Sequence, residues 1–241
     1  MYSLKSFIIF LLLIFLNINS VHSQSLELRE SLKNTKTFDK EGKLIEAVNS
    51  ALDTIKFSKI DFGQKHYYTA TLIENLGIIQ YELLMYKEAK KSFMEVLDIR
   101  KVTLDQDHTD IAESLNYIAL TNRKLFQYDD AISYHNQALL VMSRSITKSN
   151  PHAMNEKNRK GAIFKASALH TKALIEIKNK NLNNAIGLLK ASSKIFYNTL
   201  GKDKSQLIDS YKELIKLALV INDIELENKT KQKLSNIENK I

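Results

Sequence analysis

The sequence of 241 residues contains no cysteine, one proline and six glycines. Without cysteine the chain cannot form a disulfide, a thiolate metal site, a cysteine nucleophile or a lipid-modified N-terminal cysteine. Turn-rich all-β folds need many glycine and proline residues, so their scarcity favours helices. Because 44% of the residues are hydrophobic, we expect a folded chain that packing alone stabilises.

Long hydrophobic runs are also scarce. The segment Phe7–Leu16 is apolar throughout and follows a start that carries Lys5, but it is short of the roughly 20 residues that span a bilayer. Small residues precede a cleavage point after Ser23. We therefore expect a secretory signal peptide over residues 1–23 and an exported protein, periplasmic or secreted. The alternative is an uncleaved membrane anchor. No later segment is predicted to span a membrane.

The charge balance of the sequence is only mildly basic. Removing the signal peptide, whose only charged residue is Lys5, lowers the formal net charge from +8 to +7. Lysine and glutamate are interleaved without clustered aromatic residues, which favours a solvated surface and indicates no nucleic-acid partner. A weak attraction to anionic lipid or polysaccharide is the alternative.

Motifs that carry chemistry are missing. The sequence has no HExxH, GxSxG or GxxxxGK[ST] motif, so we expect no catalytic residue, no metal and no cofactor. His66 and His108 are 42 residues apart at equivalent expected helix starts, which indicates a structural role. General acid–base catalysis by carboxylates that converge in a cleft is left open by the sequence.

What the sequence does contain is a repeat. Small residues that follow an acidic or amide side chain recur at Ala47, Ala89, Ala131 and Ala185, with steps of 42, 42 and 54 residues. One more step of 42 residues reaches Glu227, where the alanine is lost. A period of this size is typical of a stacked array of similar units.

Within a unit, the apolar spacing predicts two amphipathic helices joined by a short turn. The stripe of the first helix comprises Leu72, Ile73, Leu76, Ile79 and Leu83. The stripe of the second comprises Tyr86, Ala89, Phe93, Val96, Leu97 and Leu104. An alanine in the second stripe lets two antiparallel helices approach closely.

These residues resemble the tetratricopeptide repeat in its long variety of about 42 residues, as in kinesin light chains. Leu76 and Gly77 match the first helix of that pattern, and Tyr86, Ala89, Phe93 and Val96 match the second. The segment "IRKVTLDQDHTDIAESLN" is similar to the light-chain linker "IREKTLGKDHP". The pattern weakens where His135 replaces an aromatic residue, Lys172 a leucine and Glu227 the alanine. The resemblance implies an all-α, right-handed helical-repeat solenoid of antiparallel helix pairs.

The repeat divides the chain into seven ranges. They are a signal peptide (1–23), a degenerate repeat (24–65), two full repeats (66–107 and 108–145), a polar insertion loop (146–161), a third repeat (162–203) and a degenerate C-terminal repeat or cap (204–241). The loop accounts for the longer step and holds the only proline, Pro151. For this segment we favour a longer helix end with a tolerated insertion over a dedicated binding loop.

The resemblance also implies a peptide-binding groove lined by the first helices of successive units. The corresponding residues are Glu74, Ile78, Tyr81, Asn116, Leu120, Arg123, His170, Leu174 and Ile177. The alternative is that these are ordinary exposed helix residues. We expect an exported, non-catalytic scaffold that binds a protein or peptide ligand. The alternatives are a sensor or regulatory module that works with a signalling protein such as a histidine kinase, transcription regulator or caspase-like peptidase, and an unrecognised enzyme.

Overall fold

The structure is a computed structural model that describes residues 24–147, 151–200 and 204–239. The predicted signal peptide lies outside the described residues. The chain divides into two compact units, one ending at Thr103 and the other beginning at Leu104. The described residues form helices, turns and bends and contain no strand. The predicted all-α fold class is therefore confirmed.

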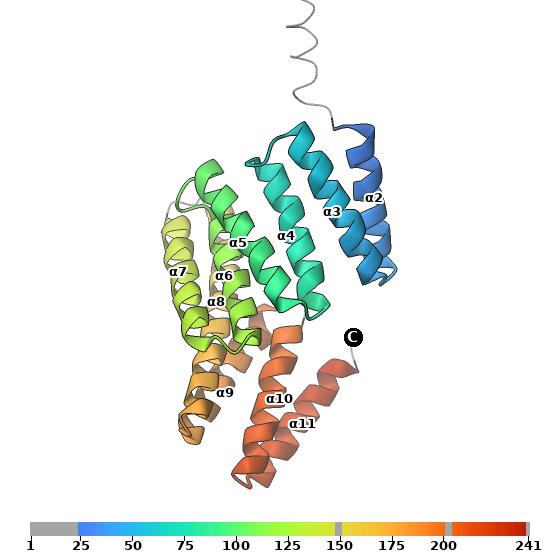
Figure 1. The fold of residues 1–241 in the computed structure, drawn as a ribbon. Coiled ribbons are helices and arrows are strands. Elements are labelled where there is room, and N and C mark those ends of the chain that lie inside the picture. Colours follow the sequence, from blue (N-terminus) through green and yellow to red (C-terminus); the bar gives the residue numbers. More distant parts are fainter. Residues whose placement is uncertain (1–23, 148–150, 201–203, 240–241) are drawn as a thin grey trace, which may run out of the picture. The chain divides into compact units, whose positions relative to one another are not determined.

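Unit 1 consists of two antiparallel helix pairs, coloured blue to green in Figure 1. The pairs are α2 (Leu26–Lys40) with α3 (Leu44–Asp61), and α4 (Tyr67–Glu82) with α5 (Tyr86–Thr103). Side chains from all four helices form one apolar core, comprising Leu28, Ala51, Ile55, Ala70, Leu72, Ile73, Leu76, Val96 and Ile99. Each helix thus buries one stripe, as the period of the apolar residues predicts.

Unit 2 consists of three further helix pairs (Figure 1). They are α6 (Thr109–Lys124) with α7 (Tyr128–Thr147), α8 (Pro151–Lys178) with α9 (Leu182–Thr199), and α10 (Ser205–Val220) with α11 (Ile224–Glu238). The last two pairs share a core built around Ala173, Phe196 and Tyr211. The helix α11 contributes only partly buried apolar side chains, Leu226, Leu234 and Ile237, to this core.

The repeated alanines have the packing role that the sequence predicts. Ala47, Ala89, Ala131 and Ala185 are all completely buried. Each is the fourth residue of the second helix of its pair, as the helix bounds show. Glu227 occupies the same place in α11, where it is half-buried and forms an ion pair with Lys231. The register of the repeat is therefore confirmed.

Gly77 shows how closely the two helices of a pair approach. A Cβ atom at Gly77 would lie 2.7 Å from Cε1 of Phe93, a side chain that is itself completely buried. Carbon atoms attract one another best at about 3.5–4.0 Å, so a side chain at this position would displace the Phe93 ring. The glycine that the tetratricopeptide pattern requires is thus explained by contact between α4 and α5.

The turn inside each pair repeats as well. Left-handed backbone conformations occur at Gly42, Leu84, Phe126, Lys180 and Asn222. Each of these residues lies two positions before the second helix of its pair. In the second pair, for example, the N–H of Met85 donates to the carbonyl of Gln80 over 2.8 Å, the bond of a Schellman motif. The sequence does not reveal this turn, because glycine is the usual residue in a left-handed conformation and only one of the five positions is glycine.

Residues 146–161 are helical over most of their described length, which contradicts the predicted polar loop and agrees with a longer helix end. α7 continues to Thr147 and α8 begins at Pro151, so the extra residues lengthen the helices. Proline is tolerated at the first position of a helix, where its missing N–H would have no partner. The added turns also have contacts, because the Lys157 ammonium donates to the Ser145 side chain over 2.8 Å. Residues 148–150 lie outside the described residues.

A groove in unit 1 and buried polar residues in unit 2

A groove in unit 1 lies between the first helices of its two pairs, α2 and α4. Its volume is about 240 Å³. Its lining residues are Leu32, Thr35, Lys36, Asp39, Ala51, Thr54, Leu72, Asn75, Ile78, Ile79 and Glu82. Apolar side chains are thus combined with a small number of charged and amide groups. This combination can hold an apolar side chain and orient the polar groups attached to it.

Ile78 is the one predicted groove residue that lines this groove. Lys36 stands 42 residues earlier, at the equivalent position of the preceding repeat, and also lines it. The predicted set began with the first well-matched repeat and therefore missed α2. Counting one period of 42 residues back from Ile78 would have identified Lys36 from the sequence.

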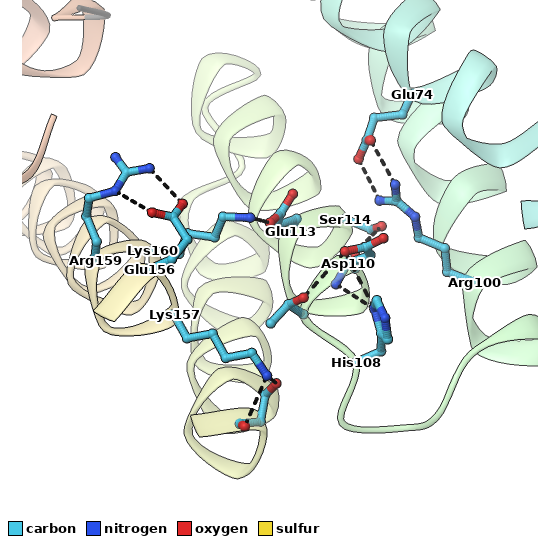
Figure 2. A network of polar contacts seen from close by, with 12 residues as sticks. Glu74, Arg100, His108, Asp110, Glu113, Ser114, Glu156, Lys157, Arg159 and Lys160 are labelled. Carbon is cyan, nitrogen blue, oxygen red and sulfur yellow. Dashed lines mark hydrogen bonds and ion pairs between the residues drawn. The ribbon is translucent and has the colours of Figure 1, made fainter. Parts of the chain in front are cut away.

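Glu74 is held by an internal ion pair. Its two carboxylate oxygens accept hydrogen bonds from the two terminal nitrogens of Arg100, over 2.6 and 2.8 Å (Figure 2). Only 13% of the Glu74 side chain and 3% of the Arg100 side chain are exposed. Two parallel bonds to a guanidinium fix the carboxylate in place. The Glu74 carboxylate thus joins α4 to α5 through Arg100.

Tyr81 lies near the turn between α4 and α5 rather than along the groove. Its ring meets that of Tyr86 edge-to-face, with 5.2 Å between the ring centroids. The side chain is half-buried. Edge-to-face pairs of this kind add a modest stabilisation to the burial of both rings. The contact ties the end of the first helix to the start of the second.

Asn116 is buried in unit 2 and contacts the second helix of its own pair. Its side-chain oxygen lies 3.1 Å from Nδ1 of His135, which is completely buried on α7. Burial lowers the pKa of His135 to about 3, and the positive charge of Arg123 adds to this effect. The imidazole is therefore neutral at pH 7. The Nε2 atom of His135 is enclosed and has no hydrogen-bond partner among the described residues.

His170 is a second buried neutral histidine. Its Nδ1 atom lies 2.7 Å from the hydroxyl oxygen of Ser210, which joins α8 to α10. Burial lowers the pKa of His170 well below its ordinary value, and the charges of Arg123 and Lys124 act in the same direction. The side chain is 3% exposed. His170 therefore offers little area to a ligand.

The remaining predicted residues differ in their exposure. Leu120 and Arg123 are buried, whereas Leu174 and Ile177 are half-buried. Ile177 packs against the core of the last two pairs. The alternative interpretation of ordinary exposed helix residues is thus wrong for Asn116, Leu120, Arg123 and His170. Whether any of the nine contacts a ligand is still a prediction.

Polar contacts near the surface have structural roles. His66 and His108 cap α4 and α6, because each Nδ1 atom accepts a hydrogen bond from the backbone N–H two residues later, over 3.1 and 3.2 Å. The predicted structural role of these histidines is confirmed. Lys160 of α8 pairs with Glu113 of α6, which fixes the helices of successive pairs in unit 2 (Figure 2).

Neither a metal cluster nor a membrane-spanning helix is found in the described part of the chain. No group of three or more histidine, cysteine, aspartate or glutamate side chains there could hold an ion. The helices of the described ranges are too short or too polar to cross a bilayer.

Comparison with known proteins is informative for the fold. Residues 68–144 match a model of the tetratricopeptide repeat family. A search of curated protein sequences finds no match.

Three solved structures illustrate the proteins that share this fold. The first is a putative kinesin light chain of Podospora anserina with nearly identical TPR-like repeats (16% identity, TM-score 0.52, 88% of this chain and 95% of that one). The second is BtubC (BKLC) of P. vanneervenii (13% identity, TM-score 0.55, 85% and 77%). The third is the apo form of RapI (16% identity, TM-score 0.55, 93% and 87%). Residues 68–144 thus match the tetratricopeptide repeat, and the repeated helix pairs with their buried alanines have the fold of tetratricopeptide-repeat proteins.

Proposed function

We propose that the protein is an exported, non-catalytic scaffold that binds an extended segment of a partner protein in the groove between α2 and α4. Tetratricopeptide repeats are scaffolds that typically mediate protein–protein interaction. The observation that carries the proposal is the groove itself, with Ile78 in its lining and charged side chains beside it. Its volume of about 240 Å³ is below the roughly 300–1,000 Å³ of small-molecule pockets, which favours a side chain of a longer ligand.

The lining defines the kind of segment that fits. Leu32, Leu72, Ile78 and Ile79 supply apolar contact for one side chain of the ligand. Asn75 can donate to and accept from a peptide backbone, because its amide carries both functions. Lys36 on one side and Glu82 on the other allow both signs of charge in the flanking positions. We therefore expect an apolar anchor residue within a polar segment.

A matched pair of variants tests the groove. Peptides selected from a displayed random library on the intact mature chain would be measured by fluorescence anisotropy. Ile78→Ala removes apolar contact and is expected to weaken binding about tenfold, or about 1.4 kcal/mol. Leu174→Ala changes the equivalent position in unit 2 and is expected to leave binding unchanged. Circular dichroism of both variants should match the parent, since alanine is a good helix former.

The opposite pattern would contradict the proposal. If Leu174→Ala weakens the selected peptides and Ile78→Ala does not, the peptide site lies in unit 2. If no peptide is selected that competes for one common site, the groove is not a peptide-binding surface.

Export is the second part of the proposal, and it is supported by the apolar segment Phe7–Leu16 and the small residues before Gln24. Cleavage after Ser23 gives a mature chain that begins at Gln24. Intact-mass spectrometry of the protein recovered from the periplasm or medium of an expressing bacterium should give this mass. Recovery of the chain with Met1 in the membrane fraction would instead show an uncleaved anchor.

A further inference from the structure

Between α2 and α3 lies a second groove of about 480 Å³, the acidic groove, which residues of these two helices alone line. Its charged lining residues are all acidic, namely Glu27, Glu30, Glu46 and Asp53. The half-buried rings of Phe38 and Phe57 supply apolar surface beside the carboxylates. The groove is therefore anionic, although the chain as a whole carries a formal net charge of +8.

The same positions one repeat later are covered by a neighbouring helix pair. One period of 42 residues after Glu30 and Asn34 stand Leu72 and Leu76, which are buried in the core that α4 shares with α2 and α3. Successive pairs of a stacked array contact one another through equivalent faces. The acidic groove is thus the face on which a preceding helix pair would stack.

Asp53 matches a residue that already joins two helix pairs. One period after Asp53 stands Glu95 of α5, whose carboxylate accepts a hydrogen bond from the Lys59 ammonium of α3 over 2.9 Å. Within unit 1, a lysine of one pair thus contacts an acidic side chain of the following pair. Asp53 stands at the position that would accept such a lysine from a further pair.

The last helix pair of unit 2 has lysines on the face where a following pair would stack. Lys212 and Lys231 occupy the repeat positions of Leu32 and Ala51, whose side chains pack into the core shared with the following pair of unit 1. Both lysines are exposed. Lys212 has no ion pair with any described residue, and Lys231 pairs only with Glu227 of its own helix.

Apolar side chains lie beside these lysines. Ile208 and Ile215 of α10 are half-buried, and Leu219 is 54% exposed. Steps of four, three and four residues lead from Ile208 through Lys212 and Ile215 to Leu219, so all four share one side of the helix. Lys216 follows Lys212 by four residues and is 68% exposed, although it pairs with Glu213 of its own helix. The basic face comprises Ile208, Lys212, Ile215, Lys216, Leu219 and Lys231.

The opposite charges of the two faces indicate what covers them. A polar end face would keep a stack of helix pairs soluble whatever the sign of its charge. Here one face combines carboxylates with two phenyl rings, and the other combines ammonium groups with aliphatic side chains. An ammonium group is attracted both to a carboxylate and to the face of an aromatic ring. Each face therefore complements the other in charge and in apolar character.

We propose that the protein self-associates head to tail, with the basic face of one copy seated in the acidic groove of a second copy. The contact continues the stacking of helix pairs from one copy to the next. Because the two faces are different surfaces, each copy in a dimer keeps one face free, and the assembly can grow further. The contact is independent of the groove between α2 and α4, so either proposal can fail without the other.

Sedimentation velocity of the mature chain at pH 7 in dilute salt tests the association. The average mass should rise with protein concentration. It should return toward that of the monomer in about 0.5 M sodium chloride, where charges are screened beyond roughly 4 Å. A chain that is wholly monomeric at about 1 mM contradicts the proposal, since even a contact with a Kd of about 1 mM would then be populated.

Charge reversal on either face should weaken the association. Glu30→Lys with Asp53→Lys makes the acidic groove cationic, and Lys212→Glu with Lys216→Glu makes the basic face anionic. Each double variant should associate about tenfold more weakly or worse, because like charges then face one another across the contact. Circular dichroism should match the parent, since all four side chains are exposed. Association of either variant at the strength of the parent would show that the contact lies elsewhere.

Mixing the two double variants distinguishes a lost contact from a damaged fold. In the mixture, the unchanged basic face of the first variant meets the unchanged acidic groove of the second, and the two reversed faces also carry opposite charges. The mixture should therefore associate about as strongly as the parent, although neither variant does so alone. Two misfolded variants would not restore each other. A mixture that stays monomeric overturns the proposal.

Lys190→Glu with Lys194→Glu is the matched control. It makes the same change in net charge at two exposed lysines of α9, outside both faces, and should associate like the parent. If this control loses association as fully as Lys212→Glu with Lys216→Glu, net charge rather than the basic face drives the association, and the proposal is wrong. A parent that stays monomeric but binds selected peptides would refute self-association and leave the peptide groove supported.

Discussion

Lowering the pH from 7 to 5 is expected to reduce the free energy of unfolding by about 2 kcal/mol through His135 alone. The ordinary pKa of histidine is 6.5, and burial of His135 lowers the pKa in the folded protein to about 3. Between these two values the unfolded chain binds a proton that the folded protein excludes. The contribution of His135 to stability is therefore complete above pH 6.5, and it is lost progressively as the pH falls from about 6.5 to about 3.

His170 acts in the same direction. Its pKa is also lowered by burial, so it excludes a proton from the folded protein over the same acidic range. The two histidines belong to one unit and both lie near Arg123, whose charge opposes their protonation. The free energy of unfolding should therefore fall more steeply with decreasing pH than it would through His135 alone.

Denaturant unfolding of the parent and His135→Phe at pH 7 and pH 5 measures the effect. Phenylalanine is the residue at the equivalent position of the preceding repeat, Phe93, where it is completely buried. The loss of stability between the two pH values should be smaller by about 2 kcal/mol in the variant. Carboxylates contribute equally to both proteins and cancel in this comparison. An unchanged pH dependence would mean that His135 is not buried as a neutral group.

Loss of the Glu74 carboxylate should have the largest effect of a single substitution. Glu74→Ala leaves Arg100 buried without its partner, and breaking a buried ion pair in this way costs about 3–5 kcal/mol. The pair has the bidentate geometry in which both oxygens are used, with distances of 2.6 and 2.8 Å. Denaturant unfolding monitored by circular dichroism would measure the difference.

A double variant shows whether the loss comes from the stranded charge. Glu74→Leu with Arg100→Met replaces both ions by apolar side chains and is expected to return close to the stability of the parent. If Glu74→Ala costs less than about 1 kcal/mol, the value of an exposed pair, the ion pair is solvated and Glu74 is available to a ligand. The same measurement thus decides whether Glu74 forms a buried ion pair with Arg100 or is available to a ligand.

The sequence by itself determined the features that depend on spacing along the chain. The 42-residue period identified the buried alanines at equivalent places in successive helices, because every unit repeats the same close approach. The spacing of His66 and His108 predicted their equivalent roles, since a helix cap needs only a side chain and the backbone two residues later. These are local relations, and the order of residues fixes them.

The tertiary structure decided the features that depend on neighbours from distant segments. Arg123 and His170 are buried, and the period of α6 or α8 alone does not reveal this. Asn116 contacts His135, although an exposed amide at that position would fit the same sequence pattern. α8 begins at Pro151, and its Lys157 contacts Ser145 of α7, a pairing that the sequence pattern does not reveal. Burial is a property of the space around a side chain, so only the packed helices define it.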